Sequence, residues 1–180
     1  MNRVVVATVL AFLAIAGLSD LRSRRISNRL NLGATVIGLW LHFVGGGLDG
    51  LCFAAAGWVV GLTLLLLPFA AGLVGGGDVK FTAAAGAFLG YRLLLVGLAA
   101  GVLLGGVVGL ITLLVRGRAR EAFRRLYGDL FSLASGVRPE RLSQSAGVET
   151  VPYGLLLAIG MAAALIGNGW RVIPWASLWF

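Results

Sequence analysis

Long apolar runs, separated by short polar stretches, dominate the pattern of hydrophobic and polar positions along the chain. Six runs stand out, at residues 4–18, 30–44, 51–74, 81–90, 93–115 and 151–166. A helix that crosses a bilayer needs about 20 mostly apolar residues, and a helix satisfies its backbone polar groups internally. The pattern therefore predicts an all-α polytopic membrane protein with six transmembrane helices, which form a single membrane domain over residues 1–180.

The composition supports this class and excludes others. Hydrophobic residues make up 59% of the 180 residues and charged residues 12%, whereas soluble domains average about 45–50% and 25%. A soluble chain of this length cannot bury so much apolar surface in one core. The single cysteine, Cys52, and the single histidine, His42, exclude a disulfide framework and a Cys/His zinc cluster, and we expect no metal or cofactor.

The net charge of +8 follows the membrane topology. Cytoplasmic loops are enriched in Lys and Arg, so we interpret the basicity as orientation rather than as nucleic-acid binding. If both termini lie outside the inner membrane, 12 of the 15 basic residues fall in cytoplasmic segments 20–29, 75–80 and 116–150. Small residues at 14–16 resemble a signal-peptide cleavage site, but the arginines that follow favour a retained first helix.

Small residues at a spacing of four predict where helices pack closely. Gly97, Gly101, Gly105 and Gly109 line one face of the run 93–115. Such a stripe lets two helix backbones approach each other in a membrane. The same spacing relates Gly57 to Gly61 and Ala83 to Ala87. The alanine pair predicts that the run 81–90 is tightly surrounded by its neighbours.

The basic stretch 116–150 has a helical pattern of its own. Phe123, Leu126, Tyr127, Leu130 and Phe131 recur at helical spacing among arginines. This pattern is typical of an amphipathic helix that lies on the inner leaflet and binds anionic lipid. A solvated run of charges is the alternative interpretation.

The chain has only seven acidic residues, so each can be considered in turn. Asp49 lies in a glycine-rich turn, and four more belong to the basic stretch, namely Glu121, Asp129, Glu140 and Glu149. The remaining two are Asp20, which closes the first helix, and Asp78, which opens the fourth. The topology derived from the basic residues places both at the cytoplasmic face.

Two carboxylates that meet in a site of low dielectric suggest acid–base chemistry. They share one proton, so one can activate water while the other polarises a peptide carbonyl, as in aspartic proteases. The glycines at 75–77 would break helical order and admit an extended substrate strand. Alternatively, Asp20 caps a helix or pairs with Arg22, Arg24 or Arg25, and Asp78 is only an N-cap. The residues alone leave both interpretations open.

Four short segments resemble the type IV prepilin peptidases. Gly75-Gly76-Gly77-Asp78 matches the Gly-x-Gly-Asp motif of intramembrane aspartyl proteases. Asp20, followed by Arg25-Ile26-Ser27-Asn28, resembles the first motif of the family, in which an Asp precedes a basic residue and Ile-Pro-Asn. Val79-Lys80 and the segment 151–154 are also similar to the family.

The resemblance implies an inner-membrane aspartyl endopeptidase that removes the short basic leader of prepilins or pseudopilins at the cytoplasmic face. It implies catalytic roles for Asp20 and Asp78, and motif roles for Gly75, Gly77, Lys80, Arg25 and Asn28. Lys80 would orient the site or meet a lipid phosphate. No metal or organic cofactor is implied for cleavage.

Two departures define the type of family member. Ser27 stands where the family often has Pro, and the chain lacks the Cys-x-x-Cys domain of the larger bifunctional members. It is therefore similar to the compact tight-adherence (Flp) peptidases, and N-methyltransferase activity is not expected. The alternatives from other classes are a small transporter or channel that uses the two aspartates as a proton relay, and a structural scaffold of pilus assembly.

Overall fold

A computed structural model describes residues 3–70, 74–115, 117 and 153–169. It contains four helices, α1 (Arg3–Ser23), α2 (Asn28–Ala70), α3 (Gly76–Val115) and α5 (Tyr153–Gly169), and no strand within these ranges. The all-α prediction is confirmed. The basic stretch 116–150, apart from Gly117, and the tryptophan-rich tail from residue 170 lie outside the described residues, so the amphipathic helix stays a prediction.

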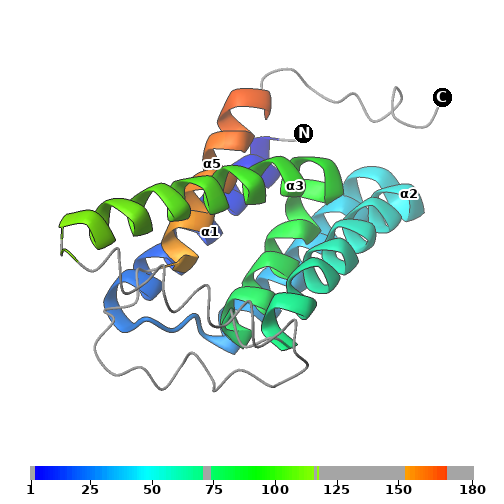
Figure 1. Cartoon of the computed structure of the whole chain (residues 1–180). Coiled ribbons are helices and arrows are strands. Elements are labelled where there is room, and N and C mark those ends of the chain that lie inside the picture. Colours follow the sequence, from blue (N-terminus) through cyan, green and yellow to red (C-terminus); the bar gives the residue numbers. More distant parts are fainter. Residues whose placement is uncertain (1–2, 71–73, 116, 118–152, 170–180) are drawn as a thin grey trace.

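The two long helices each change direction at one glycine. Gly47 (φ 60°, ψ −139°) interrupts α2, and Gly90 (φ 69°, ψ 169°) interrupts α3. Glycine adopts such backbone angles readily because it has no Cβ. In Figure 1, α2 folds back into two adjacent segments and α3 turns to cross the molecule. The two glycines thus divide the described helices into six segments that match the six predicted apolar runs.

Among the residues that the structure describes, three helices are long and apolar enough to cross a membrane. They are α1, α2 and the part of α3 over Gly76–Thr112, whereas α5 is shorter. Large apolar side chains are exposed along them, for example Leu103, Leu67 and Val115. Exposed apolar surface on this scale is typical of a membrane protein. The number of crossings stays a prediction, because helix length and composition alone select these spans.

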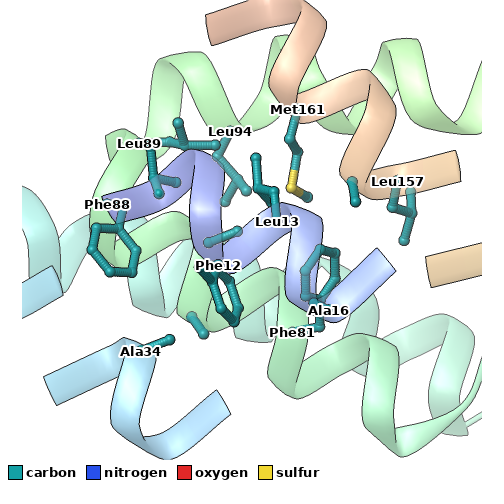
Figure 2. Packing of buried hydrophobic residues seen from close by; sticks show 14 of the residues in the cluster. Phe12, Leu13, Ala16, Ala34, Phe81, Phe88, Leu89, Leu94, Leu157 and Met161 are labelled. Atoms are coloured by element: carbon teal, nitrogen blue, oxygen red, sulfur yellow. The ribbon is translucent and has the colours of Figure 1, made fainter. Parts of the chain in front are cut away.

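The core forms where α1 meets α3 and α5. Figure 2 shows side chains of α1 that lie among those of the other two helices. The ring of Phe12 lies 5.5 Å from that of Phe81 and 6.0 Å from that of Phe88, measured between centroids. Leu157 and Met161 of α5 complete the cluster and are at most 1% exposed. This core fixes the end of α1 beside the starts of α3 and α5.

The first segment of α3 is enclosed, as the small-residue pairs predicted. Every residue from Phe81 to Gly90 is buried. A Cβ added at Gly61 would lie 2.6 Å from the carbonyl oxygen of Thr82, and one at Gly57 would meet the backbone of Gly86. These two glycines of α2 therefore let the backbones of α2 and α3 touch.

The glycine stripe of α3 faces α5 along three of its four members. A Cβ at Gly97 would lie 2.7 Å from the Cα of Met161, and one at Gly101 would lie 2.8 Å from the Cα of Leu157. Gly105 meets the ring of Tyr153. Gly109 has no described atom within 4 Å of its Cβ position, because α5 begins opposite Gly105, so its place in the seam stays a prediction.

Candidate active site

Asp20 lies in the last turn of α1 and contacts the start of α5. Its side chain is 7% exposed, and its Oδ2 accepts a hydrogen bond of 3.1 Å from the backbone N–H of Leu155. Leu155 is the third residue of α5, where backbone N–H groups have no partner within their own helix. Asp20 thus provides a hydrogen-bond acceptor for the first turn of α5, although Leu155 lies 135 residues away in the sequence. The helix α1 continues to Ser23, so Asp20 does not close it as predicted.

Gly154 makes this contact possible. A Cβ added at Gly154 would lie 3.0 Å from Cγ and Oδ2 of Asp20 and 3.0 Å from Cδ1 of Ile26. Such distances are shorter than ordinary van der Waals contacts, so a side chain here would push Asp20 away from α5. This packing gives a structural reason for the glycine that ends the segment 151–154.

The turn after α1 holds the second half of the first motif in place. The backbone N–H of Arg24, which has a positive φ of 51°, donates to the carbonyl of Asp20 over 2.8 Å. The hydroxyl of Ser19 donates to the carbonyl of Arg25 over 2.9 Å, and that of Ser23 donates to the carbonyl of Ser19 over 2.7 Å. Ile26 is consequently buried against Gly154, whereas the side chain of Arg25 is exposed.

Asp78 is the third residue of α3. The backbone N–H groups of Asp78 and Val79 donate to the carbonyl of Gly75 over 3.1 and 3.4 Å, so the helix starts directly after Gly75. Gly76 and Gly77 are helical, which corrects the prediction that all three glycines break helical order. Gly75 supplies the carbonyl at this helix start, so Asp78 is not the N-cap. The Oδ2 of Asp78 would lie 3.4 Å from a Cβ at Gly75, so the half-buried carboxylate lies over this glycine.

The structure brings the two predicted aspartates into one region. Asp20 lies in the last turn of α1 and Asp78 in the first turn of α3, and Asp78 lies within electrostatic reach of Asp20. Charged groups at the depth of membrane helices are costly and are mostly retained for function. The buried carboxylate of Asp20 and the half-buried carboxylate of Asp78, which come from different helices, therefore form the candidate site.

Three polar side chains of α2 and α3 surround the start of α3. The Nζ of Lys80 donates to Oδ1 of Asn28 over 3.0 Å, so two residues of the predicted motifs are in contact. Sequence reasoning missed a third residue, Asn31, whose Nδ2 lies 3.5 Å from the carbonyl oxygen of Gly77. The signal was a second asparagine three residues after Asn28, on the same face of a helix.

No group of three or more His, Cys, Asp and Glu side chains that could hold a metal ion occurs in the described part of the chain. The site geometry therefore rests on carboxylates, amides and backbone groups. These groups can hold water, transfer protons and bind a peptide main chain.

A model of the type IV leader peptidase family matches residues 7–110. The matched segment covers more than half of the chain and contains both aspartates and the Gly-x-Gly-Asp motif. The chain belongs to the type IV leader peptidase family. Neither the curated proteins nor the solved structures include a match to the chain. Membership confirms the family resemblance seen in the sequence and implies peptidase activity, whereas the matched segment ends before α5 and its contact with Asp20.

Proposed function

We propose that this family member is an intramembrane aspartyl endopeptidase that removes the short basic leader of prepilins or pseudopilins. The observation that carries the proposal is the placement of two carboxylates, Asp20 and Asp78, within electrostatic reach of each other in a segment that matches leader peptidases. Asp20 and Asp78 are the catalytic pair. Gly75 and Gly77 border the path of the substrate strand. A Cβ added at Gly77 would have no described atom within 4 Å, which supports open space beside this glycine.

The proposed reaction needs only the two carboxylates and water. One carboxylate takes a proton from water while the water oxygen bonds to the scissile carbonyl carbon, and the other carboxyl gives its proton to the carbonyl oxygen. The resulting diol then collapses. Its C–N bond breaks, the leaving nitrogen receives the proton that the first carboxyl had taken, and a diol hydroxyl returns a proton to the second. The pair ends in its starting protonation state.

The arginines around Asp20 support cleavage at the cytoplasmic face of the inner membrane. Arg22, Arg24 and Arg25 follow Asp20 directly and are exposed. Arginines that flank a membrane helix favour the cytoplasmic side. The leader of a prepilin precedes its hydrophobic segment, so its cleavage point would reach the membrane at this same level. The bond from Lys80 to Asn28 supports a role of Lys80 in orienting the site, and its other N–H groups could still meet a lipid phosphate.

The test uses the full chain, purified in detergent and reconstituted with a model substrate in proteoliposomes. The substrate has a basic leader, a glycine at the cleavage point and one hydrophobic helix. Asp20→Asn and Asp78→Asn are each expected to lower the cleavage rate by roughly 10²–10⁴-fold, which is the usual contribution of a general acid or base. Asp49→Asn, at an exposed turn of α2, is the matched control and keeps wild-type cleavage.

Two results would contradict the proposal. If either site variant cleaves at the wild-type rate, the carboxylate pair does not perform the reaction. If proteoliposomes conduct protons in an aspartate-dependent way and cleave no substrate, the two aspartates serve an ion relay instead.

A further inference from the structure

Two buried polar atoms without a hydrogen-bond partner flank Asp78. The Oδ1 of Asn31 and the Oγ1 of Thr82 are both buried, and neither has a partner among the described residues. Asn31 is 3% exposed and Thr82 is 0% exposed. A buried polar atom without a partner costs free energy, so each such atom in a native protein calls for an explanation.

Asn31 lies directly beside the peptide that precedes Asp78. Its Nδ2 faces the carbonyl oxygen of Gly77, which can only accept a hydrogen bond. This contact fixes the orientation of the carboxamide, because the flipped form would place two acceptor oxygens together. The Oδ1 of Asn31 is therefore an oriented acceptor, one peptide away from Asp78.

Thr82 lies one helical turn after Asp78. Residues at i and i+4 share a helix face, so the hydroxyl of Thr82 lies on the face that carries the Asp78 side chain. A threonine within a helix usually donates to the carbonyl of residue i−4, as Thr35 does to Asn31 over 2.9 Å. Thr82 makes no such bond. Its buried hydroxyl thus has no hydrogen-bond partner among the described residues, although it can both donate and accept.

We infer that Asn31 and Thr82 bind the main chain of the substrate beside the scissile peptide. The inference rests on the proposed peptidase function of the same site. An extended peptide exposes backbone N–H and C=O groups that cannot be left unpaired in a membrane interior. Asn31 offers an acceptor for a substrate N–H, and Thr82 can serve either group. The resting enzyme carries these unpaired atoms because their partners arrive with the substrate.

The experiment compares binding and stability in the same variants. Asn31→Leu keeps the branched shape of the side chain without its polar atoms, and Thr82→Val does the same for the hydroxyl. Each is expected to raise KM about five- to tenfold, the effect of losing one hydrogen bond, and to leave kcat within about twofold. The denaturant midpoint of Thr82→Val stays at or above that of the wild type, because an unpaired buried hydroxyl is removed.

Thr63→Val is the matched control for the hydroxyl. Thr63 is exposed on α2 and already donates to the carbonyl of Val59 over 2.8 Å, so KM remains at its wild-type value. If Asn31→Leu does not fold, Thr82→Val still tests the inference at a second position.

Several outcomes would overturn the inference. An unchanged KM in folded Thr82→Val and Asn31→Leu shows that the two atoms do not bind substrate. A fall in kcat at constant KM assigns them to the catalytic water instead. Both results presuppose a wild-type enzyme that cleaves, and they leave the proposed peptidase intact. Absence of cleavage by the wild type would refute the proposed function itself.

Discussion

A single methyl group at Gly154 is expected to separate Asp20 from α5. In Gly154→Ala the new Cβ would lie 3.0 Å from Cγ and Oδ2 of Asp20 and from Cδ1 of Ile26. Neither neighbour is free to retreat, because Asp20 is bonded to Leu155 and Ile26 is buried. Loss of the hydrogen bond to a carboxylate costs about 1.5–3 kcal/mol, and forced packing costs about 1–3 kcal/mol. We expect a total loss of roughly 2.5–6 kcal/mol of unfolding free energy.

The assay is denaturant-induced unfolding of the purified chain in detergent micelles, followed by intrinsic tryptophan fluorescence. Gly167→Ala is the control on the same helix, because a Cβ at Gly167 has no described atom within 4 Å. Alanine is the better helix former by about 1 kcal/mol, so this variant is expected to be neutral or slightly more stable. If the two variants unfold within about 0.5 kcal/mol of each other, the close approach of Asp20 to α5 is refuted.

The hydrogen bond itself can be isolated at Leu155. Leu155→Pro and Leu155→Ala both lose the side chain that packs on Gly17, but only proline also removes the backbone N–H that reaches Asp20. Proline is tolerated in the first turn of a helix, where the N–H has no helical partner. We expect the proline variant to be less stable than the alanine variant by about 1.5–3 kcal/mol and to cleave more slowly. Equal stability and equal cleavage in the two variants would show that the bond has no role.

Two further predictions concern the glycines that place α3, and both use the same unfolding assay. Gly57→Ala, whose Cβ would enter the backbone of α3, is expected to lose about 1–3 kcal/mol, whereas Gly33→Ala, which meets no described atom within 4 Å, is expected to lose none. Gly90→Ala is expected to be less stable than Gly47→Ala. Both bear a backbone cost of about 1–3 kcal/mol for a positive φ. Only Gly90 also faces the ring of Phe53. Equal losses within either pair would contradict the packing described for α3.

The positions of the helices could be predicted from the sequence because hydropathy is a local property. Each apolar run became a helical segment, and the glycine-rich boundaries near residues 45–50 and 90 became turns. Hydropathy could not show that each of these turns would need only one non-helical residue. Gly47 and Gly90 each interrupt the helical backbone at a single residue, so the two helical segments of α2, and likewise those of α3, follow each other with no loop between them.

The site was only partly predictable, for a different reason. Asp20 and Asp78 could be selected because acidic residues are rare and costly in such a chain. The partner of Asp20 could not, because it is a backbone N–H, and every residue except proline carries one. Asn31 was missed because an asparagine near a helix start has an ordinary role as a capping residue. Its burial becomes visible only when α2 lies against α3.

The contact between Asp20 and Leu155 means that the proposed catalytic region is assembled from three helices rather than two. The family match ends at residue 110, so it includes both aspartates but not α5. Yet α5 provides the hydrogen bond that orients Asp20, and the stripe at Gly97 and Gly101 lets α5 pack closely enough on α3 to reach it. The same α3 carries Asp78 at its other end. The small-residue seam of α3 thus helps to hold α5 where its N–H reaches Asp20, so the proposed chemistry would depend on helix packing as well as on the motif residues.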